Sequence, residues 1–352
     1  MPLLEKSIIK EAPQLPIGQQ YSEFVRMPAD RALQISQRSD FLARLSAAVA
    51  PFTLSVRSTA LGLGMTGDAP AVTVARRVFD QAATLDHMAA VDTIFSQANL
   101  DAVVSGAMKR DLAFRLEGLI RPVRPLSFAQ MALMKDLLNM SVPLIFGVGP
   151  TGTGKTHLAI AAGLTLLARN DVAHLVLTRP HERSDGDMGT SSSETDRGFN
   201  DQIAVFYDIL YELTGHADIQ SLINHRRLEI IPLSQMRGRT FNDSLVLIDE
   251  AQNLSARRMR MAVTRTGRRS RMVVTGDPSH VELKNGEPSG LAHLLDMLKD
   301  TDIARIHAFQ PRQVIRNRTV ARIESLYAGT PFEGFVDADL HDEEMTAETT
   351  RH

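Results

Sequence analysis

Eight residues near the middle of the chain constrain its fold more than any other segment. They run from Gly149 to Thr156 and fit the pattern G-x-x-x-x-G-K-[ST]. The glycines allow a tight curl in which successive backbone N–H groups point at one anion. A helix that begins near Lys155 adds the positive end of its dipole. The pattern predicts a phosphate-binding loop, and a chance turn rich in glycine and threonine is the alternative.

In the predicted loop, Lys155 reaches the outer phosphates and the Thr156 hydroxyl ligates Mg²⁺. The predicted phosphate contacts are Gly149, Pro150, Thr151, Gly152, Thr153, Gly154, Lys155 and Thr156. Residues 142–148 before the loop form an apolar run typical of a buried strand, and apolar residues after it recur at helical spacing. Strand, loop and helix in this order favour a nucleoside triphosphate site.

Composition limits the other possibilities. The chain has 352 residues, enough for two domains, and its 43% hydrophobic content is typical of a soluble globular protein. A net charge of −2 gives no general basic field, so nucleic acid would need local patches. The absence of cysteine excludes disulfides, thiolate catalysis and cysteine-bound zinc. Because we find neither a signal-peptide pattern nor an apolar stretch of membrane-spanning length, we expect a cytoplasmic protein without membrane contact.

We expect five segments along the chain. They are a flexible arm (1–30), a small α/β module (31–88), a helical connector (89–124), an α/β nucleotide-binding domain (125–328) and an acidic, disordered tail (329–352). Within the module, we expect a strand at 33–35, a helix at 41–49, two strands in 52–65 and a helix at 74–79.

In the large domain, apolar strands alternate with helical segments. The predicted strands are 144–148, 174–178, 228–233, 245–249, 272–275 and 303–309. The alternation predicts a parallel sheet with helices on both faces, in which ligands bind at the carboxyl ends of the strands. The polar stretch 184–200 is expected to be a long mobile loop.

Two acids follow the apolar run 245–248. A carboxylate at the position of Asp249 can hold Mg²⁺, and the adjacent Glu250 can polarise the attacking water as a general base. A strand followed by a helix-capping aspartate is the alternative. The next strand ends in Thr275, Gly276 and Asp277. Because its end should lie beside Asp249, Thr275, Asp277 and His280 are candidate phosphate sensors, although a simple polar turn is also compatible.

Several arginines are candidates for phosphate contacts. Arg179 ends the second strand, and Arg237 and Arg239 precede the Asp249 strand. A guanidinium group pairs with two phosphate oxygens, but each of these sites is also compatible with a surface turn. Arg316 is a candidate arginine finger. Residues 257–271 contain seven arginines and no acid, which indicates either a solvated face or a patch for nucleic-acid phosphates.

With these residues assembled, the chain resembles the PhoH-like ATPase family. Five motifs occur in family order: 149–156, Leu-Thr-Arg-Pro at 177–180, Met-Arg-Gly-Arg-Thr at 236–240, Asp-Glu-Ala-Gln-Asn at 249–253 and Val-Thr-Gly-Asp at 274–277. The resemblance implies a RecA-like core that hydrolyses ATP with Mg²⁺, in which Gln130 reads adenine. It also implies a role in RNA metabolism, with an endoribonuclease as partner.

The resemblance also has departures. The small module is similar to a KH-like domain but lacks the G-x-x-G clamp, since the matching region is Gly-Asp-Ala-Pro at 67–70. His280 stands where the family usually has glutamine, and 184–200 lacks a Gly-Phe-Leu-Pro-Gly element. One RecA-like core gives half of a closed ATP site, so we expect a homo-oligomer, most simply a hexameric ring in which Arg316 acts in trans.

Three functions are compatible with these residues. The first is an RNA-linked ATPase or helicase. The second is an ATP-gated adaptor that binds a protein partner such as an endoribonuclease without translocation. The third is a small-molecule kinase, which Glu250 and Gln130 argue against.

Overall fold

The computed structural model describes two compact units. One comprises Met1–Phe114 and Arg124–Phe128, and the other comprises Arg115–Val123 and Ala129–His352. The described residues are 20–50, 52–84, 116–180, 192–281, 287–299 and 301–310, with single positions at 94, 96, 99, 100, 103, 104, 106, 107, 283, 322, 323 and 326. Arg316, residues 1–19, most of the predicted connector and the predicted tail lie outside this set. In the described part of the chain, no helix has both the length and the hydropathy needed to cross a bilayer.

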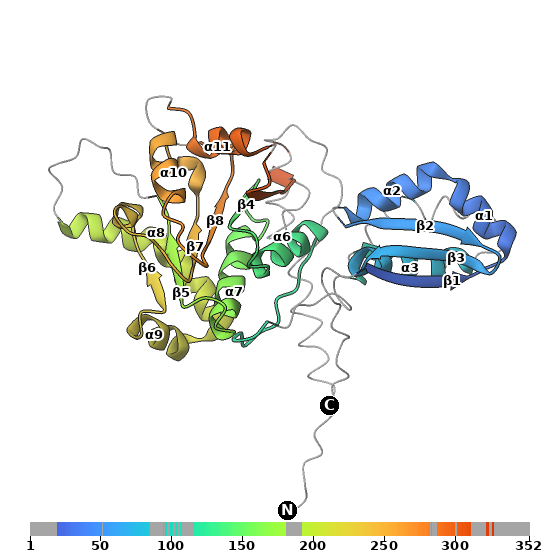
Figure 1. Ribbon diagram of the computed structural model, residues 1–352, viewed down its shortest axis with the longest axis horizontal. Helices are drawn as coiled ribbons and strands as arrows, with labels where there is room; N and C mark the ends of the chain where they lie inside the picture. The colour runs from blue at the N-terminus through green and yellow to red at the C-terminus, as the bar shows by residue number, and fades with distance from the viewer. Residues whose placement is uncertain are drawn as a thin grey trace, which may run out of the picture. The chain divides into compact units, whose positions relative to one another are not determined.

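The first unit is a small α/β module built on an antiparallel sheet of order β1-β3-β2 (Figure 1). Its elements are β1 (Gln20–Arg26), α1 (Ala29–Gln37), α2 (Ser39–Val49), β2 (Leu54–Thr59), β3 (Gly62–Asp68) and α3 (Ala69–Ala83). The strands in 52–65 and the helices over 41–49 and 74–79 are confirmed. Two other expectations for this part of the chain were wrong.

The first error concerns the arm, because β1 occupies residues 20–26 of the segment expected to be flexible. The second concerns residues 33–35, which belong to helix α1. Ala32 and Ile35 are fully buried three residues apart, while Leu33 between them is 48% exposed. That spacing is helical, and a three-residue window was too short to show it. The segment 67–70 is not a free turn either, because it spans the end of β3 and the start of α3.

The second unit contains a six-stranded parallel sheet of order β6-β5-β7-β8-β4-β9. Its strands are β4 (Leu144–Val148), β5 (His174–Thr178), β6 (Leu228–Ile230), β7 (Ser244–Ile248), β8 (Arg271–Gly276) and β9 (Ala304–Ala308). All six predicted strands are present, although β6 ends three residues early because Leu233 begins a 3-10 turn, η2 (Leu233–Met236). The fold is therefore the expected α/β, RecA-like arrangement.

Helices cover both faces of this sheet. They are α6 (Phe128–Leu138), α7 (Lys155–Ala168), α8 (Ser192–Thr214), α9 (His216–Asn224), α10 (Ala256–Val263) and α11 (Gly290–Leu298), with a 3-10 turn η3 (Ala251–Asn253) after β7. Helix α7 packs closely on β5, because a Cβ at Gly163 would lie 2.6 Å from Leu175 Cδ1. On the other face, Met259 of α10 and Leu291 of α11 join a buried apolar cluster with Val246 and Val274.

Two further expectations about the second unit need correction. Residues 192–200 belong to α8, so half of the expected loop is helical, while 181–191 lie outside the described residues. Residues 116–122, expected at the end of a helical connector, form turns and bends. Arg271, one of the seven clustered arginines, is fully buried at the start of β8 and is not part of a surface patch.

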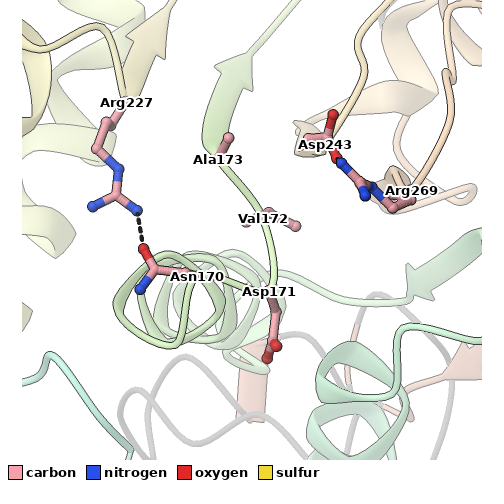
Figure 2. A pocket seen from close by; sticks show the side chains of 7 residues that line it. All are labelled: Asn170, Asp171, Val172, Ala173, Arg227, Asp243 and Arg269. Carbon is pink, nitrogen blue, oxygen red and sulfur yellow. Dashed lines mark hydrogen bonds and ion pairs between the residues drawn. The ribbon is translucent and has the colours of Figure 1, made fainter.

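A hollow of about 640 Å³ lies at the amino-terminal ends of the strands, at the edge of the sheet opposite to the phosphate loop. Figure 2 shows the residues that line it. Its two cations are already paired: Arg269 Nε donates to Asp243 Oδ1, and Arg227 Nη2 donates to Leu167 O (2.8 Å) and to Asn170 Oδ1 (3.3 Å). These pairs use the cations that an anionic ligand would need. We therefore place the chemistry at the carboxyl ends of the strands.

Candidate nucleotide-binding site

The loop between β4 and α7 has the backbone that phosphate binding requires. Gly149 has φ +128°, and a Cβ there would lie 2.3 Å from Phe309 O, so no side chain fits. Gly149 N–H donates to Gly276 O (3.0 Å), which fixes the loop to the end of β8. Gly154, the residue before α7, is left-handed at φ +81°. Helix α7 thus begins at Lys155 with its N–H groups directed at the loop.

The Lys155 ammonium lies over this loop. Its Nζ donates to Gly149 O (2.7 Å), Pro150 O (2.6 Å) and Thr153 Oγ1 (3.2 Å), and the residue is 8% exposed. The cation therefore lies against the loop, and a cation in this place is suited to neutralise the charge of a bound phosphate.

Asp249 connects the three elements of the site. Its Oδ1 accepts hydrogen bonds from Thr156 Oγ1 of α7 (2.8 Å) and Thr275 Oγ1 of β8 (2.6 Å). The side chain is 4% exposed. Burial and the neighbouring Glu250 carboxylate raise the pKa of Asp249, against the opposing effects of Arg179 and the two hydroxyls. Hydroxyl and carboxylate oxygens within 3 Å of each other are the hard ligands that Mg²⁺ prefers, so this pair fits the ion.

Glu250 turns the chain at the end of β7. It adopts a left-handed conformation at φ +51°, which is costly for a residue with a side chain. Its Oε1 accepts a hydrogen bond from Arg179 Nη2 (2.7 Å), and its Oε2 accepts one from Gln252 Nε2 (2.6 Å). The carboxylate remains 34% exposed and is oriented by two donors, as a general base requires.

Gln252 is a further candidate site residue, which the sequence analysis did not single out. Besides donating to Glu250, its Oε1 accepts the backbone N–H of Asp277 (3.1 Å), and the residue is 4% exposed. It therefore connects the end of β7 with the end of β8. The motif Asp-Glu-Ala-Gln contained the signal, but its partner lies 25 residues further along the chain.

The carboxylate of Asp277 contacts its own turn. Oδ1 accepts from Ser279 Oγ (2.6 Å), and Oδ2 pairs with His280 Nδ1 (2.8 Å). Burial alone would raise the pKa of Asp277, but hydrogen bonds from Ser279 and His280 lower it by more. Of the three candidate sensors, Thr275 thus reaches Asp249 directly, whereas Asp277 and His280 pair with each other.

Residues 122–328, more than half of the chain, match the family described as "PhoH-like protein". The chain belongs to the PhoH-like family. It is 35% identical over 208 residues to the PhoH-like protein of Mycobacterium tuberculosis (strain ATCC 25618 / H37Rv), covering 59% of this chain and 58% of that protein. It is 36% identical over 184 residues to that of Bacillus subtilis (strain 168), covering 52% and 58%.

Protein PhoH of Escherichia coli (strain K12) is 31% identical over 209 residues, with 59% and 58% covered. The chain thus spans less than two thirds of the length of each of these relatives. A crystal structure of the DUF1998 helicase MrfA bound to DNA aligns with 54% of this chain and 26% of its own, at 16% identity and a TM-score of 0.31, too low to support an argument.

The remaining predicted residues of the PhoH-like region fall into two groups. Gln130 of α6 is 2% exposed, and its Nε2 donates to Thr153 O (2.9 Å), so it reaches the phosphate loop. Arg179 reaches the two acids. Arg239 does not reach them, because its Nη2 pairs with Glu229 in the middle of β6 (2.9 Å) and its guanidinium covers the Phe241 ring. Arg237 is exposed, and Arg316 lies outside the described residues.

Proposed function

We propose that the chain is a Mg²⁺-dependent ATPase whose turnover is coupled to RNA. The observation that carries the proposal is the convergence on Asp249, where α7, β7 and β8 bring Thr156, Asp249 and Thr275 within hydrogen-bond distance. Oriented Glu250 stands next to this cluster. Binding alone needs the loop and its lysine, whereas hydrolysis also needs a positioned base.

In this proposal each residue has one task. The loop N–H groups and Lys155 hold the phosphates, while Thr156 and Asp249 hold Mg²⁺, which neutralises phosphate charge when bound. Glu250 accepts a proton from the attacking water, and Arg179 and Gln252 hold its two oxygens in place. Gln130, whose Nε2 donates to Thr153 O of the loop, contacts the base.

The test is ATP turnover with and without single-stranded RNA. Glu250→Gln should lower kcat at least about 100-fold while ATP binding persists, because it removes the base and keeps the shape. Lys155→Ala should abolish turnover through lost phosphate contacts. Turnover that survives in both variants would overturn the site. Turnover that no RNA stimulates would favour the adaptor function, in which ATP gates a protein partner such as an endoribonuclease.

The single parallel sheet motivates a further proposal about assembly. One RecA-like core supplies one wall of the ATP site, and we propose that a neighbouring copy in a hexameric ring supplies the other, with Arg316 acting in trans. Sedimentation with ATP and Mg²⁺ should show this oligomer. Mixing Lys155→Ala subunits with Arg316→Ala subunits should restore part of the turnover. In a mixed ring, some ATP sites combine the intact Lys155 of an Arg316→Ala subunit with the intact Arg316 of a neighbouring Lys155→Ala subunit. Full turnover by a monomer would contradict the assembly.

A further inference from the structure

The first unit has one covered and one open sheet face. In β3, Leu63 and Met65 are at most 1% exposed and Gly67 is buried, whereas Thr66, which lies between Met65 and Gly67, is exposed. In β2 the burial alternates in the same way, with Ser55 and Arg57 exposed. Successive side chains of a strand point to opposite faces, so the apolar face packs on helices α1 to α3 and the other face is open to solvent.

Strand register arranges the open face in three rows. The middle row is Phe24 of β1, Gly64 of β3 and Arg57 of β2. The two flanking rows are Ser22, Thr66 and Ser55 on one side, and Arg26, Gly62 and Thr59 on the other. A phenylalanine and an arginine thus lie on either side of a glycine, beside a row of residues with hydroxyl groups.

Gly64 leaves the centre of this face flat without being required by the fold. A Cβ at Gly64 would have its nearest neighbour, Arg57 O, at 3.9 Å, which is ordinary contact. Larger residues would therefore fit the packing and would favour the strand. Neighbouring strands lie about 4.8 Å apart, so Phe24 and Arg57 stand about 10 Å from each other with an open floor between them.

The charges on this face suit a polyanion. Arg26 and Arg57 are exposed, and Phe24, which shares β1 with Arg26 and a row with Arg57, is 38% exposed. The acid of β1 is turned to the covered face, where Glu23 Oε2 accepts from Arg76 Nη1 of α3 (2.8 Å). At the end of the open face, the Asp68 carboxylate is occupied by the backbone N–H and hydroxyl of Thr53 (2.8 and 2.9 Å).

We propose that this open face binds single-stranded RNA. A base stacks on Phe24 over the floor at Gly64, and Arg57 and Arg26 contact phosphates. The hydroxyl row of Ser22, Thr66 and Ser55 hydrogen-bonds ribose 2′-hydroxyls. The missing G-x-x-G clamp is then no obstacle, because binding uses the sheet. This face consists of residues other than those of the ATP site, and because it supplies the RNA contact of the proposed function, it rests on that proposal.

The experiment measures the fluorescence anisotropy of a labelled, mixed-sequence 20-nucleotide RNA with the full chain and no nucleotide. Phe24→Ala should weaken binding at least about fivefold, because stacking of one base is lost. Phe24→Leu should weaken it equally and Phe24→Trp should preserve it, since an aromatic face is required. Equal binding by wild type and Phe24→Leu would overturn the proposal.

Gly64→Val tests whether RNA binding needs the flat surface between Phe24 and Arg57, and it should not disturb the fold. We expect RNA affinity to fall at least about fivefold while the melting temperature stays the same or rises, because valine favours strands.

Arg57→Gln should reduce the slope of log K against log salt by about 0.7, as expected for one lost phosphate contact. As the control, Arg44→Gln on α2 should change neither affinity nor slope. Unchanged affinity in Gly64→Val, or tighter binding of DNA of the same sequence, would overturn the proposal.

The same binding assay separates this site from the ATPase proposal. If the wild-type chain hydrolyses no ATP but the sheet variants lose RNA, only the ATPase proposal fails. If hydrolysis is normal and the sheet variants bind RNA normally, only the sheet proposal fails.

Discussion

Gln252 donates from Nε2 to Glu250 Oε2 across 2.6 Å, and the same amide accepts the backbone N–H of Asp277 at 3.1 Å. One buried side chain therefore joins the candidate base at the end of β7 to the turn after β8. Since Thr275 on β8 also bonds Asp249, a shift of β8 would move both acids of the site. This coupling suggests the first two predictions.

Gln252→Leu should lower the rate of ATP hydrolysis more than the affinity for ATP. Glu250 loses one of its two donors and is less well oriented, for which we expect kcat to fall about 10- to 100-fold. The buried N–H of Asp277 loses its acceptor, which should cost about 1–3 kcal/mol of unfolding free energy. Steady-state kinetics and urea unfolding measure these effects. Gln235→Leu, at an exposed site of η2, is the control, and an unchanged kcat in Gln252→Leu would refute the coupling.

Gly276→Ala should weaken the hydrogen bond between Gln252 and the backbone of Asp277 by changing β8 rather than Gln252. The new Cβ would lie 2.5 Å from Gln252 Oε1 and 2.9 Å from Leu291 Cδ2, and such overpacking costs about 1–3 kcal/mol. Because Gln252 is itself the clashing group, the cost should be at least about 0.5 kcal/mol smaller in a Gln252→Ala background. Urea unfolding of the four proteins in this cycle gives the answer. If the two substitutions change the unfolding free energy additively, the new methyl group does not clash with Gln252, and the prediction is wrong.

Arg271→Met should destabilise the fold strongly. The fully buried guanidinium donates from Nε to Val142 O (2.9 Å) and from its other nitrogens to Leu137 O and Asn139 O, the carbonyls at the end of α6. Burial lowers the pKa of Arg271 to about 10, with Asp136 opposing part of the effect. Losing three donors should cost about 2–4 kcal/mol in urea unfolding. Exposed Arg268→Met should stay within about 0.5 kcal/mol, and equal losses in both would contradict this role.

Arg271 also shows where the sequence misleads. It follows six arginines and precedes an apolar strand, so its residue type suggested a surface patch. Its burial depends on carbonyls more than 120 residues earlier in the chain, which no local pattern reveals. The six strands of the large sheet were predictable for the opposite reason. A strand covered on both faces is apolar along its whole length, and that run is visible locally.

The residues of the candidate site also fall into those that local sequence patterns predict and those that depend on tertiary contacts. The loop, Asp249 and Glu250 follow local patterns, and Gln130 followed from the family resemblance. By contrast, Arg239 was expected at the phosphates, yet it pairs with Glu229, because a nearby carboxylate in the fold satisfies it first. The role of Gln252 depends on the adjacency of β7 and β8. Strand order decides such contacts, and strand order is a tertiary property.

His280→Gln should change stability in a pH-dependent way. The pKa of Asp277 lies below its ordinary value, so its ionised form stabilises the fold above about pH 4, and this stabilisation is lost as the pH falls through the folded-state pKa. Replacing His280 removes one cause of the lowering. We expect a loss of less than about 1 kcal/mol at neutral pH, since the histidine is 54% exposed. Urea unfolding at pH 7, 5 and 3.5 should show the difference shrinking at the lowest pH, and a constant difference would contradict the assignment.

Thr156→Val should raise the Mg²⁺ requirement of turnover. The substitution keeps the shape of the side chain but removes the hydroxyl that lies 2.8 Å from Asp249 Oδ1, and with it one of the two proposed metal ligands. We expect the Mg²⁺ concentration at half-maximal rate to rise about 10-fold or more, as one lost ligand contact of about 1.4 kcal/mol implies. Thr156→Ser should retain the wild-type dependence because the hydroxyl remains. Thr165→Val is the matched control on the same helix, since its hydroxyl donates to Ala161 O and not to the site. If Thr156→Val and the wild type require the same Mg²⁺ concentration, Thr156 is not a ligand and the metal site must be assigned to Asp249 with other oxygens.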